Sequence, residues 1–184
     1  MQELSLNILD IAENSVRAGA LLVRIEVKTL QADDRMEIII TDDGKGMDEA
    51  TAQGAADPFY TTRTTRKVGL GLPYMKMNAE LTGGTMKIES SPGVGTKVAA
   101  SFGLGHIDRI PLGDMGQTMS ILAGANPEMD FVYELNADGA DFIFDTREIK
   151  RVLDGVPVSE PAVMIYMSSY INENTKELTA KYGI

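Results

Sequence analysis

Several residue types are absent or scarce in this sequence, and each absence excludes a class of protein. There is no cysteine and only one histidine, so a disulfide framework and a Cys/His zinc site are both excluded. Basic residues are outnumbered, with 17 Lys and Arg against 27 Asp and Glu, which gives a formal net charge of −10. Binders of nucleic acid or of anionic membranes need a basic face, so neither partner is expected.

Long hydrophobic runs are also absent. Residues 1–20 contain no continuous apolar run after a basic start, and no later stretch approaches the length that crosses a membrane. Apolar residues still make up 43% of the 184 residues, which is enough for a core. We therefore expect a folded, cytoplasmic protein with one domain of ordinary size and an appendage.

Hydrophobic spacing predicts the elements of the first hundred residues. Leu4, Ile8, Ile11 and Val16 recur at helical spacing, and Gly19 ends that pattern. Alternation of apolar and polar residues predicts strands at 21–29, 35–41, 85–90 and 96–102, and helical spacing predicts helices at 48–54 and 70–81. The strands are expected to form one sheet with helices on one side.

A polar stripe lies on the first predicted helix. Asn7, Asp10, Asn14 and Arg17 follow at steps of three and four, so two amides, a carboxylate and a guanidinium share one face. The second strand then ends directly in DDGKGM, which begins at Asp42. A solvated helix face and a Gly-rich turn explain these features as well as a ligand site does.

The stretch 57–71, DPFYTTRTTRKVGLG, has the composition that suits a polyphosphate. It combines four threonine hydroxyls, three cations and two glycines just before a helix entered through Leu72. A helix N-terminus offers free N–H donors and a partial positive charge, and glycine lets an anion approach the backbone. We therefore expect a nucleoside triphosphate to bind here.

Other phosphate and nucleotide motifs do not fit. The sequence contains no GxxxxGK[ST], which excludes a P-loop, and no HRD or DFG, which excludes a protein kinase of that type. VGLGLPY lacks the third glycine of a dinucleotide fingerprint and does not follow a predicted strand within a βαβ unit.

Five segments in order carry a family resemblance. NILDIAENS, DDGKGM, DPFYTTR, VGLGL and VGTKV resemble the N, G1, F, G2 and G3 boxes of the gyrase, Hsp90, histidine kinase and MutL (GHKL) ATP-binding superfamily, over residues 4–103. The resemblance implies an α/β (α+β) two-layer sandwich, a mostly antiparallel mixed sheet covered on one face by helices, known as the Bergerat-type fold. Residues 1–104 would form this ATP-binding domain, and residues 105–184 a small α+β appendage.

The resemblance also implies a role for individual residues. Asn14 matches the asparagine that binds the Mg²⁺ bridging the triphosphate, and Arg17 stands where histidine kinases often have a phosphate-contacting lysine. Asp42 matches the aspartate that accepts a hydrogen bond from the adenine amino group. The other expected ATP-binding residues are Gly44, Gly46 and Met47 at the base, Thr96 in the G3 box, Thr61, Thr62, Arg63 and Lys67 in the lid, and Gly69, Leu70, Gly71 and Leu72 at the phosphates.

Two departures from the family pattern bear on catalysis. Asp10 stands where the family's ATPases have a glutamate that orients or deprotonates the attacking water, and aspartate is one methylene shorter. Val68 replaces the first glycine of the G2 box, and the loop from Gly46 to Gly69 is short, which indicates a compact lid. ATP binding therefore carries over better than hydrolysis, and slow turnover is expected.

The last eighty residues lie outside the resemblance. The spacing predicts a helix over 114–124, a hairpin of strands 131–135 and 141–145, a helix capped by Thr146, and a last helix after Pro161. His106 lies between glycine and proline, downstream of the ATP-binding boxes. The phosphoacceptor histidine of histidine kinases sits on a helix ahead of them, so we expect a turn or packing role for His106.

Two functions follow as expectations. The first is a Mg²⁺-dependent ATP-binding protein that hydrolyses ATP slowly or transfers its phosphoryl group to a partner protein, with Asp10 as the catalytic residue. The second is a nucleotide-sensing regulatory module, comparable to anti-sigma switches, with little or no catalysis. A MutL-like or gyrase-like role ranks third because the large transducer domain and a basic surface are missing. Whether the protein forms a homodimer stays open.

Overall fold

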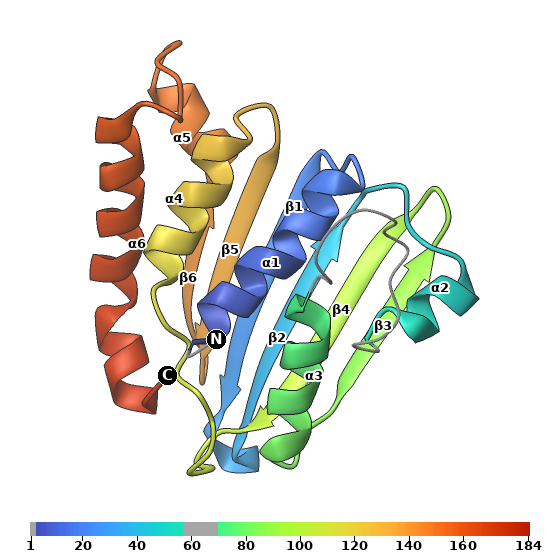
Figure 1. Ribbon diagram of the computed structural model, residues 1–184. Coiled ribbons are helices and arrows are strands. Elements are labelled where there is room, and N and C mark those ends of the chain that lie inside the picture. Colours follow the sequence, from blue (N-terminus) through green and yellow to red (C-terminus); the bar gives the residue numbers. More distant parts are fainter. Residues whose placement is uncertain (1–2, 57–69) are drawn as a thin grey trace.

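A six-stranded mixed sheet carries helices across one face (Figure 1). The computed structural model describes residues 3–56 and 70–184. The elements in chain order are α1 (Leu4–Arg17), β1 (Leu22–Leu30), η1 (Gln31–Asp33), β2 (Arg35–Asp42), α2 (Glu49–Gly54), α3 (Gly71–Leu81), β3 (Met86–Ser91), β4 (Gly95–Gly103), α4 (Met115–Ala125), β5 (Asp130–Ala137), β6 (Ala140–Asp145), α5 (Thr146–Val152) and α6 (Pro161–Tyr182). The predicted fold class is confirmed.

The order of strands across the sheet is β3-β4-β2-β1-β5-β6. β1 and β2 form an antiparallel pair from Val23↔Asp42 to Leu30↔Arg35, and β4 pairs antiparallel with both β2 and β3. Every second residue of β1 is buried toward the helices, which is the alternation that the sequence shows. Asp42 therefore lies at the end of a central strand, on the helix-covered face.

The C-terminal hairpin extends the same sheet. β5 lies parallel to β1, from Leu22↔Asp130 to Thr29↔Ala137, and β6 forms the antiparallel edge strand. The hydrophobic core is continuous across this junction, because Ile8 and Met119 from the helices pack in one buried cluster with Phe131. The division at residue 104 stays a prediction, but strands from both sides of it share one sheet.

Helix α1 lies between α3 and α4 on the covered face (Figure 1). Leu4, Ile8 and Ala12 have no exposed surface, so one side of the helix is wholly in the core. Its first turn is fixed by the connector after β4, since the N–H groups of Leu4 and Ser5 donate to the carbonyls of residues 111 and 112 at 2.9 and 2.7 Å. This anchoring positions the remainder of α1 over the end of β2.

One predicted cap is wrong by one residue. Asp145, and not Thr146, caps α5, because its Oδ1 accepts a hydrogen bond from the N–H of Arg147 at 2.8 Å. The hydroxyl of Thr146 is instead turned into the core, where it accepts from the N–H of Phe131 at 2.9 Å. His106 lies in a turn, and its Nδ1 accepts from the N–H of Asp108 at 3.1 Å.

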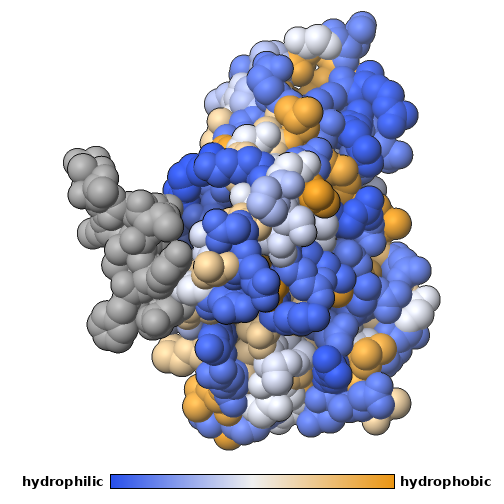
Figure 2. All heavy atoms as spheres, turned by 90° about the vertical axis from the view of Figure 1, so that its right-hand side faces the viewer, coloured by the Kyte–Doolittle hydropathy of each residue, from blue (hydrophilic) through white to orange (hydrophobic). Residues whose placement is uncertain are grey.

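The side of the molecule next to β3 and α2 is mostly hydrophilic, with small scattered apolar patches (Figure 2). Across residues 3–56 and 70–184, no helix combines the length and the hydrophobicity that crossing a bilayer requires.

Candidate functional site

The carboxylate of Asp42 is held by two donors from different elements. Ser15 of α1 donates its hydroxyl to Oδ2 at 2.6 Å, and the N–H of Gly44 donates to Oδ1 at 2.9 Å. Asp42 is only 9% exposed, so these bonds fix the orientation of a nearly buried acceptor. The helix that carries Asn14 and the strand that ends in Asp42 thus meet on one face of the sheet.

Ser15 is a site residue that the sequence prediction missed. It follows Ile8 and Ile11 on the core face of α1 and is 3% exposed. A hydroxyl in this apolar row needs a partner, because a buried polar group without one is costly. That signal was present in the sequence, but it does not identify the partner.

Asp43 has a different role from its neighbour. Its Oδ1 accepts from the N–H groups of Leu21 and Leu22 at 2.7 and 2.9 Å. The two adjacent carboxylates therefore have different partners, since Asp43 bonds the backbone at the start of β1 while Asp42 bonds Ser15 of α1.

The glycines around Asp42 allow backbone segments to approach closely. Gly46 has φ +64°, and a Cβ there would overlap the carbonyl of Ser91. At Gly44 a Cβ would lie 2.9 Å from the Cβ of Ala18. The missing side chains thus serve contacts within the protein, and their predicted role in making room for a base stays a prediction.

A hydroxyl network lies beside this turn. The N–H of Met47 donates to Ser90 Oγ at 2.8 Å, and that oxygen lies 2.9 Å from Thr96 Oγ1. Thr96 is the direct partner of Asp42 in the β2–β4 register. The structure therefore brings together three residues of the predicted adenine end, namely Asp42, Met47 and Thr96.

The carboxylate of Asp10 lies at the N-terminus of α3. The N–H of Gly71 donates to Asp10 Oδ2 at 2.6 Å. Leu70, at the N-cap position, has a side chain without an acceptor, so Asp10 supplies the acceptor from the neighbouring helix. A Cβ at position 71 would lie 2.7 Å from Asp10 Oδ2, so any larger residue there would displace the Asp10 carboxylate from its present position. Leu72, next along α3, packs partly buried against the core.

One helical turn further along α1, Asn14 and Arg17 contact each other. Arg17 Nη2 donates to Asn14 Oδ1 at 2.8 Å, and Nη1 lies 3.4 Å from Glu13 Oε2. Asn7, one turn before Asp10, is fully buried, and its amide has no hydrogen-bond partner within the described part of the chain. The predicted stripe is therefore not a simple solvated face.

Mg²⁺ requires hard oxygen ligands, and the site offers few of them from the protein itself. In the described parts of the chain, no group of three or more His, Cys, Asp or Glu residues could hold a metal ion. The amide oxygen of Asn14 is a suitable ligand, and Mg²⁺ usually takes few protein ligands together with substrate phosphates and waters. The residues therefore fit a metal that arrives with a polyphosphate, and do not form a protein-only cage.

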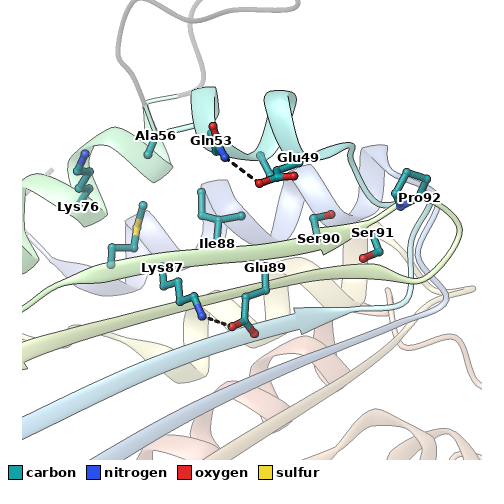
Figure 3. A pocket seen from close by; sticks show the side chains of 12 residues that line it. Glu49, Gln53, Ala56, Lys76, Lys87, Ile88, Glu89, Ser90, Ser91 and Pro92 are labelled. Atoms are coloured by element: carbon teal, nitrogen blue, oxygen red, sulfur yellow. Dashed lines mark hydrogen bonds and ion pairs between the residues drawn. The ribbon is translucent and has the colours of Figure 1, made fainter.

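A cavity of about 730 Å³ lies between α2 and β3, with Lys76 of α3 at its side (Figure 3). Ile88 and Ser90 point into it from β3, whereas Lys87 and Glu89 point to the other face of the strand. Within the described chain, its lining does not include the Asp42 or Asn14 positions. The cavity borders the hydroxyl network of Ser90 and Thr96 through Ser90, and it is a separate hollow.

Five of the predicted site residues lie outside the described residues, namely Thr61, Thr62, Arg63, Lys67 and Gly69. The others lie in the second half of α1, from the end of β2 into the turn that follows it, at the start of α3 and at the start of β4, where Thr96 pairs with Asp42.

Comparisons with known proteins agree with this arrangement. Residues 1–106 match the family described as histidine kinase-, DNA gyrase B-, and HSP90-like ATPase. A non-motile and phage-resistance protein of Caulobacter vibrioides is 32% identical over 98 residues, which cover 50% of this chain and 12% of that protein. Sensor histidine kinase YxdK of Bacillus subtilis is 32% identical over 83 residues, which cover 43% of this chain and 26% of that protein.

A solved structure, that of the N-terminal domain of a DNA repair protein, has a similar fold. It matches with a TM-score of 0.50 and 17% identity over 78% of this chain and 52% of that one. The chain thus spans only part of each of these proteins. Its match to the family model covers more than half of its own length and includes every residue of the candidate site. The chain belongs to the family of histidine kinase-, DNA gyrase B-, and HSP90-like ATPases.

Proposed function

We propose that this protein binds ATP with Mg²⁺ at the end of the sheet where α1, α3 and β2 meet, and that it hydrolyses ATP slowly or transfers the γ-phosphoryl group to a partner protein. The observation that carries the proposal is that α1 contacts both the end of β2 and the start of α3. Ser15 of this helix holds the Asp42 carboxylate, and Asp10, one and a half turns earlier, contacts the first N–H of α3. One helix thus contacts both groups that are proposed to hold the nucleotide, the Asp42 carboxylate and the N-terminus of α3.

At the base end, Asp42 is the group proposed to select adenine. An ionised carboxylate only accepts hydrogen bonds, so it pairs with the amino group of adenine and opposes the carbonyl oxygen of guanine. Its two existing bonds, to Ser15 and Gly44, leave each oxygen with further accepting capacity. This supports a preference for ATP over GTP.

At the phosphate end, the N-terminus of α3 and Arg17 are proposed to hold the anion. The partial positive charge of a helix N-terminus favours phosphate there, and a guanidinium adds further positive charge. Asn14 would hold Mg²⁺, which when bound neutralises phosphate charge during transfer.

Calorimetric titration with ATP, ADP and GTP, each with and without Mg²⁺, tests the binding. We expect ATP to bind more tightly than GTP, and Asp42→Asn to weaken ATP binding at least tenfold. Asp43→Asn is the matched control, because it makes the same charge change one residue away and is expected to change ATP affinity less than threefold. Equal affinities for ATP and GTP would contradict the proposal.

Catalysis is tested separately by overnight phosphate release and by transfer of labelled phosphate. We expect slow turnover in the wild type, and its loss in Asn14→Ala and Asp10→Ala. Equal activity in all three proteins would remove the assigned site.

One observation favours a second function, a nucleotide-sensing module with little catalysis. The residue at the expected catalytic position is Asp10, which is shorter than glutamate, and one of its oxygens accepts from the Gly71 N–H. A ligand shifts a conformational equilibrium only through its different affinity for the two states. If turnover is undetectable, partner capture should differ between ATP, ADP and no nucleotide. Identical capture in all three conditions would exclude this function.

A further inference from the structure

The contact between Asp10 and Gly71 joins two elements that the proposed function needs. Asp10 is half-buried on α1, and its Oδ2 accepts from the first N–H of α3 at 2.6 Å. The pair is 61 residues apart in sequence, so the contact is tertiary and does not arise within one helix. In this structure a side-chain anion therefore occupies the first donor of the helix that is proposed to bind phosphate.

A carboxylate and a phosphate oxygen have the same requirement at such a donor. Both are anions that a helix N-terminus favours, and one N–H makes one strong hydrogen bond. The two anions also repel each other when they lie side by side at low dielectric. Asp10 and a phosphate therefore compete for the Gly71 N–H.

We propose that the Asp10 carboxylate is the resting occupant of the Gly71 N–H and that a nucleotide phosphate replaces it there. This inference rests on the proposed function, because it requires phosphate to bind at α3. Nucleotide binding then releases Asp10 from α3 and loosens a tie between α1 and α3. Asp10 is a positioning residue in the resting protein, and it is free to face the phosphate only after exchange.

Two features make exchange at this position reasonable. Asp10 is half-buried, so its carboxylate can be hydrated after release, and this hydration offsets the loss of the bond to Gly71. The missing side chain of Gly71 leaves the N–H accessible to an anion. A Cβ there would lie 2.7 Å from the Asp10 oxygen that now accepts from it. A carboxylate enclosed in the core would instead act as a permanent cap.

Asp10→Asn tests whether the Asp10 carboxylate competes with phosphate for the Gly71 N–H or helps phosphate to bind. The amide oxygen still accepts from Gly71, but it is neutral and holds the N–H less strongly than a carboxylate does. We expect the variant to bind a non-hydrolysable ATP analogue about tenfold more tightly than the wild type, whereas adenosine, which has no phosphate, binds both proteins equally. Glu80→Gln, at the other end of α3, makes the same charge change and is expected to stay within twofold of wild type.

The outcomes distinguish this inference from the proposed function. Failure of wild type to bind either adenosine or the analogue contradicts the proposed function. Binding that is equal or weaker in Asp10→Asn, with wild-type binding intact, overturns the competition. If Asp10→Asn does not fold, nuclear magnetic resonance of the wild type decides. Saturation with the analogue should then shift both the Gly71 amide and the Asp10 carboxyl signals, and an unchanged Asp10 signal overturns the inference.

Discussion

The hydroxyl of Ser15 orients the carboxylate of Asp42, which is proposed to recognise adenine. The serine bond at 2.6 Å holds one carboxylate oxygen, and without it the Gly44 N–H would be the one hydrogen-bond donor to Asp42 among residues 3–56 and 70–184. Removing one partner of a buried pair usually costs more than the pair's net contribution, because the other partner stays desolvated.

Ser15→Ala should therefore weaken ATP binding by about tenfold or more, since a hydrogen bond to a charged group contributes about 1.5–3 kcal/mol. Ser5→Ala is the matched control, because Ser5 is equally buried on α1 but bonds Glu3 at 3.3 Å. Calorimetric titration of both variants measures the difference. Equal losses of ATP affinity in the two variants would show that Ser15 affects binding only through the stability of the fold.

Tyr133 provides a residue-scale prediction about stability. Its hydroxyl is buried without a hydrogen-bond partner among the described residues, and burial raises the pKa of Tyr133 above its ordinary value. The unfolded state ionises at its ordinary pKa of about 10, while the folded state stays neutral. Stability from this residue is therefore present below pH about 10 and is lost as the pH rises further, by about 1.4 kcal/mol per pH unit.

Tyr133→Phe should remove that alkaline loss and leave stability at pH 7 unchanged or slightly higher, because no hydrogen bond is broken. Urea unfolding at pH 7 and above pH 10, followed by circular dichroism, measures both. Wild-type and variant curves that decline in parallel above pH 10 would contradict it.

At this scale the sequence predicts some residues and not others. Asn14 and Asp42 can be predicted from the sequence because each stands in a motif of fixed spacing. The bond from Ser15 to Asp42 and that from Gly71 to Asp10 are not visible, because each depends on how α1 approaches a distant element. Periodicity gives the face of a helix, and it does not give its position over the sheet.

Among the elements, the turn after β2 depends most on glycine. Gly46 has φ +64° and faces the Ser91 carbonyl, whereas Gly19, at the end of α1, has φ +73° and open space where a Cβ would stand. Alanine at either position is strained by the backbone, but only position 46 adds a steric overlap.

Gly46→Ala should therefore destabilise the protein by about 2–4 kcal/mol, and Gly19→Ala by about 1 kcal/mol. Urea denaturation of the two variants tests the difference. Equal losses would show that backbone conformation alone accounts for both.

Element prediction succeeds where the period of apolar residues is regular. The alternation in β1 and the helical spacing in α1 gave the correct types and nearly the correct ends. The predicted cap of α5 was wrong because aspartate and threonine are both favoured N-cap residues, and Asp145 and Thr146 are adjacent. Only the fold shows that the threonine hydroxyl is used by Phe131 in the core.

For the whole molecule, the parallel pairing of β5 with β1 is the feature that sequence could not provide. A hairpin pattern predicts that β5 pairs with β6, but it does not say which strand the hairpin joins. Because β1 has partners on both sides, the sheet and the core continue from residues 1–104 into residues 105–184.

The protein should therefore unfold in one cooperative transition, and a fragment of residues 1–104 should be markedly less stable than the full chain. The fragment would expose one edge of β1 and the α1 surface that packs on α4. Thermal unfolding followed by circular dichroism, together with resistance to protease, tests this. Two separate transitions in the full chain, the first confined to residues 105–184, would contradict it.

The turn after β2 also has a mechanical consequence through Asp43. This carboxylate grips the backbone of Leu21 and Leu22, the carbonyl of Leu21 accepts from the N–H of Asp130, and Lys150 of α5 reaches the Asp130 side chain at 2.8 Å. The backbone beside Asp42 is therefore connected to α5 through consecutive hydrogen bonds. The far end of that line lies on α5, the helix that follows the C-terminal hairpin, so hydrogen bonds connect the turn beside Asp42 with the last eighty residues of the chain.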